Sequence, residues 1–235
     1  MKNQSWAFFP VALVAAALAV AGCGPWSGKA SSAGSSPARP TAEVLHTDVI
    51  NAMNKASSVR LSGTLEDSGA KYTLDLKLTR SGDSSGSVAV GSAPFFLLST
   101  GGHSYIELTA SFMKYAKLPS AACSLMCGKY LELSASDAKS MVGSLSWKSI
   151  FGTVAGSTTT FRYGGSAIVD GQPAWLMHVS DGSTVYVSTQ GSHYPLRLVE
   201  PGNNQGQADF TQWNSVKIPP VPPASKVVNL SQLGA

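Results

Sequence analysis

The stretch Lys71–Thr79, KYTLDLKLT, constrains the fold more than any other part of the sequence. Tyrosine and leucine alternate there with charged or hydroxylated residues. Since successive side chains of a strand point to opposite faces of a sheet, this period of two predicts a strand with one dry face and one wet face. Sheets with one face in water are typically antiparallel, so we expect the chain to be built around an antiparallel sheet.

Strand patterns of this kind recur along most of the chain, separated by turn segments rich in Gly, Pro, Asn, Asp and Ser. Further strands are expected at Val59–Leu65, Ser87–Val90, Pro94–Ser99, Ser104–Leu108, Tyr130–Leu133, Thr159–Tyr163, Ala167–Val169, Pro173–Val179, Thr184–Ser188, Tyr194–Glu200 and Ala208–Trp213. A first helix is expected after Thr41, which can serve as its N-cap, with an apolar face from Leu45 to Ala56. Further helices are expected at Thr109–Leu118 and Ser136–Phe151. The predicted fold class is α+β: a long curved antiparallel sheet, a half-barrel of about ten strands, with helices packed on the concave face.

A sheet of this size twists and curls instead of staying flat. A curled sheet with an apolar concave face, partly closed by helices, can enclose space for a ligand, although a fully packed core is the alternative. Strand position selects the candidates for lining such a cavity: Leu74, Leu76, Leu78, Phe96, Leu98, Trp175, Met177, Val185 and Val187. Each of these residues has ordinary core packing as its alternative role.

The N-terminus has the organisation of a secretory signal. Val11–Ala21 is an uninterrupted apolar run of 11 residues, whereas a membrane-spanning helix takes roughly 20. The run leads into Val20-Ala21-Gly22-Cys23, which resembles a bacterial lipobox. We therefore expect residues 1–22 to be a lipoprotein signal peptide and Cys23 to carry the lipid, with acyl chains such as palmitate. Two or more such chains hold a protein stably, which predicts an extracytoplasmic protein anchored to the outer face of the cell membrane.

Residues 23–40 are expected to be a lipidated flexible tether, because Gly, Ser, Ala and Pro dominate them. The 17 residues after Cys23 would reach roughly 60 Å when stretched. Residues 41–235 are expected to form a single domain. The formal net charge of +4 is too mild to indicate a nucleic-acid partner, and we expect a monomer.

Several stretches resemble a known group of proteins. ASSVRLSGTLEDSG follows the first helix, HSYIELTASFMKYAKLP leads into GKYLEL, and STVYVSTQGSHYPLRLVEPG precedes the last strand. Together with the lipobox, these stretches resemble the LppX/LprA/LprF/LprG-type lipoproteins of high-GC Gram-positive bacteria, which share the fold of the lipoprotein carrier LolA. The resemblance implies a half-barrel sheet around helices, with a hydrophobic cavity that holds acyl chains of lipids or lipoglycans. It supplies no short motif of cavity residues and does not require a C-x-x-x-C pair.

Cys123 and Cys127 lie four residues apart in AACSLMCGK and have three possible roles. They could form a redox site, a soft-metal site for Cu(I) with Met126 between them and His103 approaching in space, or a disulfide. Thiols outside the cytoplasm tend to be oxidised, which favours the disulfide. A regular helix would hold the two Cα atoms around 6 Å apart with poor dihedrals for bridging, so we expect a distorted turn that ends at Gly128.

Patterns for catalysis or metal binding are weak. The Ser-x-x-Lys spacing of penicillin-interacting enzymes occurs three times without its companion motifs, at Ser68–Lys71, Ser111–Lys114 and Ser136–Lys139. The four histidines are scattered singly, at positions 46, 103, 178 and 193, and His178 is expected on a wet strand face. We therefore predict no enzyme activity, no metal site and no cofactor.

Trp147 and Phe151, four apart on an expected helix, form an apolar stripe. The stripe could be core, a lid over a cavity mouth, or a patch that dips into a bilayer. Residues 218–225, IPPVPPAS, are expected to form an extended surface strap.

Three functions follow from these observations. The first is a non-catalytic lipoprotein that binds membrane lipids through the Cys23 anchor and holds a lipid or glycolipid in a hydrophobic cavity. The second is a structural or partner-binding envelope lipoprotein, in signalling or assembly, that uses the same fold without a ligand. The third is a copper or redox module based on Cys123 and Cys127.

Overall fold

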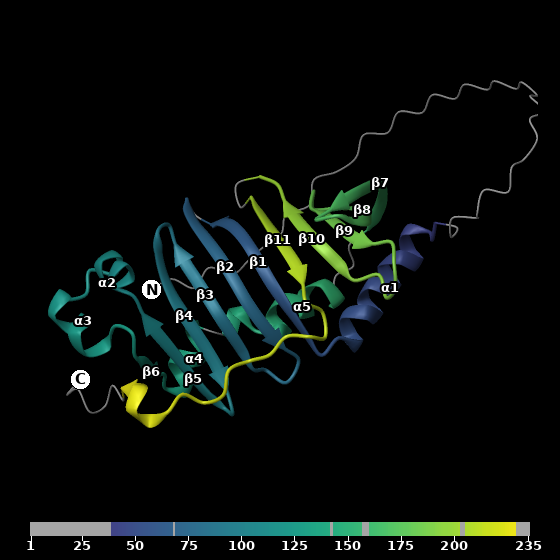
Figure 1. Ribbon diagram of the computed structural model, residues 1–235. Coiled ribbons are helices and arrows are strands. Elements are labelled where there is room, and N and C mark those ends of the chain that lie inside the picture. Colours follow the sequence, from purple (N-terminus) through teal and green to yellow (C-terminus); the bar gives the residue numbers. More distant parts are fainter. Residues whose placement is uncertain (1–38, 68, 142, 157–159, 203–204, 229–235) are drawn as a thin grey trace, which may run out of the picture.

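The structure, a computed structural model, describes residues 39–67, 69–141, 143–156, 160–202 and 205–228. The expected signal peptide, Cys23 and nearly all of the expected tether lie outside the described residues. One 12-stranded open, curved sheet organises the described chain, with a few helices on it (Figure 1). The predicted α+β class with a curved sheet is confirmed, with 12 strands in place of about ten.

The strands are β1 Ser58–Asp67, β2 Ala70–Thr79, β3 Ser84–Val90, β4 Ala93–Thr100, β5 His103–Leu108, β6 Tyr130–Glu132, β7 Phe161–Val169, β8 Gln172–Val179, β9 Thr184–Ser188, β10 Pro195–Glu200, β11 Gly206–Thr211 and β12 Val227–Val228. The helices are α1 Ala42–Lys55, α2 Ala110–Tyr115, α3 Ser120–Met126, α4 Ala135–Met141 and α5 Trp147–Gly156, with short 3-10 turns η1 Gly143–Leu145 and η2 Ala224–Lys226.

The sheet consists of two antiparallel meanders joined side by side. Strands β1 to β6 follow one another across one half, β7 to β11 across the other, and β11 returns to pair with β1. The short β12 pairs with β6 in parallel, which corrects the expectation of a purely antiparallel sheet. The reason is that the tail runs back across the sheet before it reaches this edge, so its direction there is independent of hairpin geometry.

Alternation in β2 determines which face is apolar. Tyr72, Leu74, Leu76 and Leu78 share one face, and Leu76 lies directly between Leu61 of β1 and Gly86 of β3. We call this the inner face, because α1, α2 and α5 contribute buried side chains to the core that covers it. The opposite, outer face carries the charged residues of β2, including an ion pair in which Arg60 donates to Asp75 at 2.7 Å.

Helix α1 forms as predicted. The Thr41 hydroxyl accepts a hydrogen bond from the Val44 amide at 3.3 Å, which caps the first turn. The apolar stripe of the helix, from Leu45 to Met53, is buried against the inner face.

The expected single helix Ser136–Phe151 is instead two helices, α4 and α5, separated by η1. The break follows from Gly143, a poor helix former, and from Ser146, whose hydroxyl accepts from the Ser149 amide at 3.2 Å and starts α5.

Strand β7 is one strand where two were expected, Thr159–Tyr163 and Ala167–Val169. A β-bulge between Tyr163 and Gly165 accommodates Gly164 and Gly165 within one continuous strand. Gly165 has a φ of +115°, a conformation that favours glycine. Residue 159 lies outside the described residues. Strand β3 also starts earlier than expected, at Ser84, because the turn before it is tighter than its Gly/Ser content suggests.

Two glycines on the inner face let neighbouring strands approach unusually closely. A Cβ placed on Gly63 of β1 would lie 1.9 Å from the Gln207 carbonyl oxygen, and one on Gly86 of β3 would lie 2.0 Å from that of Asp75. Both contacts are with backbone, which cannot swing away. Glycine at these positions is therefore required where the sheet curls beside β2.

The proline-rich tail forms an extended strap on the surface, as the sequence predicted. After β11 it runs over the strand ends toward β6 (Figure 1). The Val216 amide donates to the buried Ser58 hydroxyl at 3.1 Å, and Val221 lies against Gly101 in the β4–β5 turn. The strap thereby contacts the start of β1 and the β4–β5 turn before β12 pairs with β6.

Candidate functional site

Seven of the nine residues that the sequence proposed for a cavity lie on the inner face. They are Leu74, Leu76 and Leu78 of β2, Trp175 and Met177 of β8, and Val185 and Val187 of β9. They come from both meanders and belong to one continuous apolar core. The register of the sheet brings them together although more than a hundred residues separate β2 from β9.

The other two, Phe96 and Leu98, lie on the outer face, opposite Glu107 and Tyr105 of β5. Strand β4 reads APFFLLST, so apolar side chains occupy both faces and the alternation that fixes β2 is missing. Their neighbours Phe95 and Leu97 are the residues that join the inner core. Sequence position alone could not decide between these two pairs.

The interior is closed around the central lining residues. Leu76, Met177 and Val187 expose 1%, 2% and 0% of their surface. A side chain that faced a water-sized void would be accessible on that side, so protein atoms surround these three. An acyl chain could lie on them only after another part of the core had moved.

Helix α5 supplies the aromatic side chains that close the interior on one side. The rings of Trp147 and Phe151 lie 4.7 Å apart, and Phe151 lies 5.8 Å from Phe210 and 5.9 Å from Trp213. Trp213 in turn stacks on Tyr194 at 4.6 Å. The stripe predicted from the sequence is therefore core, and it reaches the surface at Trp147.

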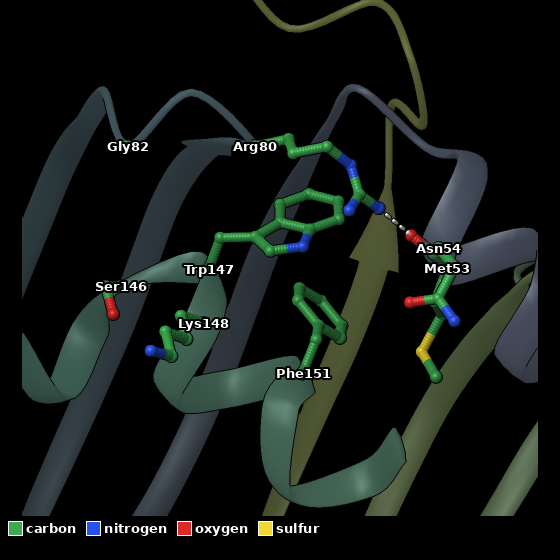
Figure 2. Close-up of a pocket in the computed structure, with 8 residues that line it drawn as sticks. All are labelled: Met53, Asn54, Arg80, Gly82, Ser146, Trp147, Lys148 and Phe151. Carbon is green, nitrogen blue, oxygen red and sulfur yellow. Dashed lines mark hydrogen bonds between the residues drawn. The ribbon is translucent and has the colours of Figure 1, made fainter. Parts of the chain in front are cut away.

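A hollow of about 360 Å³ opens at this point (Figure 2). Its lining comes from α1, the β2–β3 turn and the start of α5: Met53, Asn54, Arg80, Gly82, Ser146, Trp147, Lys148 and Phe151. The floor is apolar, and the rim carries two cations and two neutral polar side chains. This combination suits a molecule with an apolar chain and a polar, anionic head.

Arg80 holds the rim together. Its Nε donates to the Ala56 carbonyl at 2.8 Å. Its Nη2 donates to the Met53 carbonyl at 2.5 Å (Figure 2). These carbonyls end α1, where a cation is favoured by the helix dipole. The guanidinium also lies over the Trp147 ring, 5.2 Å from its centroid. Arg80 thus connects α1, the β2–β3 turn and α5, a role that sequence reasoning missed because it depends on tertiary contacts.

A second polar feature lies where α1 meets β7. His46 stacks on Phe161 at 4.0 Å, and the Arg39 guanidinium lies 3.7 Å over the Tyr163 ring. The His46 Nε2 and the Tyr163 hydroxyl are buried without a hydrogen-bond partner among the described residues. Burial lowers the pKa of His46 below its ordinary value, which favours the neutral imidazole.

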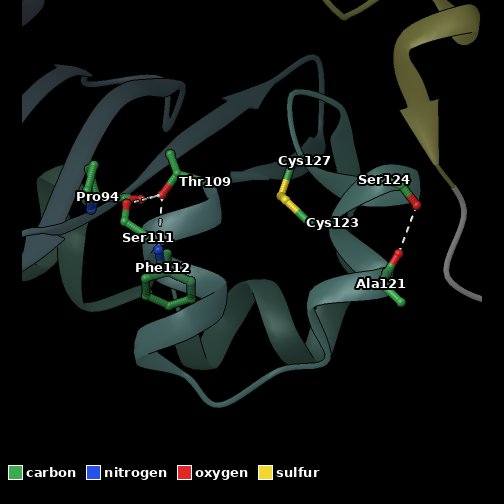
Figure 3. The surroundings of a disulfide bond; sticks show 8 residues. All are labelled: Pro94, Thr109, Ser111, Phe112, Ala121, Cys123, Ser124 and Cys127. Carbon is green, nitrogen blue, oxygen red and sulfur yellow. Dashed lines mark hydrogen bonds between the residues drawn. A yellow bond between two sulfur atoms is a disulfide. The ribbon is translucent and has the colours of Figure 1, made fainter.

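Cys123 and Cys127 form the predicted disulfide (Figure 3). The expectation of a distorted turn was wrong for the first cysteine, which lies within α3. The helix ends at Met126, and Cys127 adopts extended dihedrals as its C-cap, with Cα atoms 4.8 Å apart. The bridge is thus possible because only one cysteine is helical, and Gly128 turns the chain with a φ of +73°.

This bond leaves neither sulfur available as a thiolate for copper. The Nδ1 of His103 is 2.7 Å from the Glu132 carboxylate. Within the ranges that the structure describes, His, Cys, Asp and Glu side chains form no group of three or more that could hold a metal.

The described Ser-x-x-Lys serines are engaged locally. Ser111 bonds the Thr109 hydroxyl and Ser136 bonds the Ser134 hydroxyl, both at 2.9 Å, while Ser68 lies outside the described residues. His178 is exposed on the outer face beside Thr184, as predicted for a wet face. None of the helices in the described ranges is both long and apolar enough to cross a bilayer.

Neither a model of a known protein family nor a curated protein sequence matches the chain. Among solved structures, LprF from Mycobacterium bovis superimposes with a TM-score of 0.56 at 13% identity, over 76% of this chain and 95% of that chain. LppX from Mycobacterium tuberculosis gives 0.47 at 15% identity, over 75% and 99% of the two chains. A LolA superfamily protein from Nitrosomonas europaea gives 0.30 at 9% identity, over 77% and 96%. Of these three TM-scores, the one for LprF alone exceeds 0.5, so the fold is compared with that of LprF. The chain therefore has the fold of LprF, which confirms, at the level of the fold, the resemblance to LprF-type lipoproteins.

Proposed function

We propose that the protein is a non-catalytic, membrane-anchored carrier or binder of an amphiphile. The acyl chain of the ligand would lie between the inner face and α5, and its head group at the rim formed by Arg80 and Lys148. The observation that carries the proposal is an apolar interior that is continuous across both meanders and meets the surface at the hollow beside Trp147. The chain shares the fold of LprF, and the resemblance carried by its sequence implies a cavity of this kind.

The energetics favour long acyl chains. Removing Trp147 and Phe151 from the core would cost on the order of 6–10 kcal/mol, from about 3–5 kcal/mol for each aromatic side chain. A buried methylene group contributes about 0.8 kcal/mol. A ligand therefore needs about 8–12 buried methylene groups to offset the opening, so chains much shorter than this would not bind.

The membrane attachment in this proposal rests on the sequence. The lipobox places the acyl chains on Cys23, and the tether lets the folded part reach the bilayer to collect or deliver its ligand. We propose on the same basis that the protein acts as a monomer on the outer face of the cell membrane.

A chain-length series tests the binding proposal. A fluorescent fatty acid bound to the purified chain should be displaced by long-chain phosphatidylglycerol and not by its short-chain analogue. The variant Arg80→Met/Lys148→Met should lose the preference for phosphatidylglycerol over phosphatidylcholine, whereas the matched control Lys71→Met/Lys217→Met, altered at exposed lysines outside the hollow, should keep it. Displacement that ignores chain length would refute the interior as the site.

A scaffold function without a ligand is the second candidate, and the closed interior favours it. Leu76, Met177 and Val187 are already surrounded by protein. If the purified protein binds no acyl chain of any length while remaining folded, the partner-binding function is the better account.

A further inference from the structure

A compact lobe made of α2, α3 and the segments beside them projects from one end of the sheet (Figure 1). We define the α2–α3 lobe as residues 109–129. Tyr115, Leu118 and Leu125 in this lobe expose 56%, 42% and 54% of their surface. They are three of the seven exposed large apolar side chains in the described part of the chain, and they lie within eleven residues. Scattered exposed apolar residues are ordinary, but such a group indicates an interaction surface.

The charge of the α2–α3 lobe has one sign. Lys114, Lys117 and Lys129 lie within it, and the sequence from Leu108 to Leu131 contains no aspartate or glutamate. Lys114 and Lys117 also line a hollow of about 450 Å³ between the two helices. The nearest acidic residue that follows, Glu132, is paired with His103. The exposed apolar groups are therefore flanked by cations that no carboxylate of the lobe neutralises.

The lobe is built rigidly on the core. Met113 is buried in the main core, and Phe112 packs on Phe95 with ring centroids 4.8 Å apart. Thr109 donates to the Pro94 carbonyl at 2.5 Å and accepts from the Phe112 amide at 3.1 Å (Figure 3). With the disulfide closing the far side, the exposed residues are held in place before any partner arrives. Binding would therefore need little further ordering.

We propose that the α2–α3 lobe docks on the surface of an anionic lipid bilayer, with Tyr115, Leu118 and Leu125 entering the interface and the three lysines contacting head groups. A tyrosine and leucines surrounded by lysines are the side chains that partition into a bilayer interface, whereas the cores of protein–protein interfaces are depleted of lysine. The proposal rests on the membrane placement in the proposed function.

The position of the lobe gives the docking a consequence for orientation. The lobe lies at the opposite end of the sheet from α1, where the described chain begins (Figure 1). The tether after Cys23 would reach roughly 60 Å when stretched, so it leaves the lobe free to approach the membrane that holds the anchor. Because the anchor keeps the lobe near the bilayer, even weak docking is populated. The sheet would then lie along the membrane instead of extending away from it.

Hydrogen–deuterium exchange of the full lipidated protein in vesicles tests this docking locally. Vesicles of phosphatidylcholine with phosphatidylglycerol should slow exchange of the amides in residues 114–126 several-fold relative to phosphatidylcholine alone. Each lysine near an anionic surface contributes about fivefold to binding, so three contribute on the order of 100-fold. The variant Lys114→Gln/Lys117→Gln/Lys129→Gln should abolish the difference between the vesicles. The matched control Lys71→Gln/Arg162→Gln/Lys217→Gln, with three exposed cations changed elsewhere, should retain it.

A second variant tests the apolar part. Tyr115→Ser/Leu118→Ser/Leu125→Ser should remove the protection without changing exchange of the core strands, whereas Ile168→Ser, at a residue 75% exposed on β7, should leave the protection intact. Equal exchange of the lobe in both kinds of vesicle, or protection that survives in the lysine variant, would overturn the docking. Retention of bound lipid is measured separately by mass spectrometry, so loss of docking and failure of ligand binding give different results.

Discussion

Replacing Phe151 with alanine probes the contact that closes the interior. Phe151 exposes 5% of its surface and packs on three aromatic rings, those of Trp147, Phe210 and Trp213. The variant Phe151→Ala removes the ring from the middle of this group and leaves its neighbours in place. It should therefore weaken the fold and, at the same time, make room for a ligand.

The expected size of the effect follows from burial. Transfer of a fully buried phenylalanine contributes about 1.5–3 kcal/mol, and the vacated cavity adds about 24 cal/mol per Å³, which gives a total of about 3–5 kcal/mol. Phe96 on the outer face offers a matched control, because it exposes 42% of its surface. Water fills the space that Phe96→Ala leaves, so its loss should be about 1 kcal/mol.

Urea unfolding of the full chain, followed by circular dichroism, measures both variants. We expect the free energy of unfolding to fall at least twice as far for Phe151→Ala as for Phe96→Ala. A long-chain fatty acid should restore more stability to Phe151→Ala than to the unaltered protein, because Trp147 is then the one aromatic side chain that still has to move. Equal losses in the two variants, or no gain from the fatty acid, would refute the argument that Phe151 fills the ligand space.

Three further substitutions test other parts of the account. Arg80→Met should lower the free energy of unfolding by about 1–2 kcal/mol in urea, since the exposed guanidinium loses two hydrogen bonds to the end of α1; an unchanged midpoint would show that the rim does not depend on it. His46→Phe should flatten the fall in melting temperature as the pH drops from 7 to about 5. Burial lowers the pKa of His46 from its ordinary value of 6.5, so below pH 6.5 the unfolded chain binds a proton that the folded chain does not, and the free energy of unfolding falls. A variant as sensitive to acid as the original chain would contradict the burial of the imidazole. Gly63→Ala should cost more than about 3 kcal/mol, because its Cβ meets the Gln207 carbonyl oxygen at 1.9 Å, and a stable variant would mean that β1 and β11 can separate there.

The sequence was most informative where local chemistry and tertiary structure agree. The alternation of β2 predicted its inner face residue by residue, and Thr41 and the stripe after it predicted α1. The prediction was weaker where a pattern allowed two answers. In β4 apolar residues occupy both faces, so only pairing with β3 and β5 shows that Phe95 and Leu97, and not Phe96 and Leu98, face the core.

The candidate site depends on contacts between distant segments and was only partly predictable. Trp147 and Phe151 were identifiable from their spacing on a helix. Arg80 was not, because its importance comes from carbonyls at the end of α1 and from the ring of Trp147. The orphan polar atoms of His46 and Tyr163 were invisible for the same reason, since burial of a polar atom depends on what folds over it.

Native mass spectrometry of the full chain, purified gently with its proposed lipid anchor in place, tests the central claim most directly. The account predicts several masses above that of the acylated chain, each lost on denaturation, because the added mass is non-covalent lipid in the interior. The same measurement on Phe151→Ala should show more bound lipid, and on Phe96→Ala an unchanged amount. A single mass equal to that of the acylated chain, before and after denaturation, would contradict the carrier function and favour the scaffold.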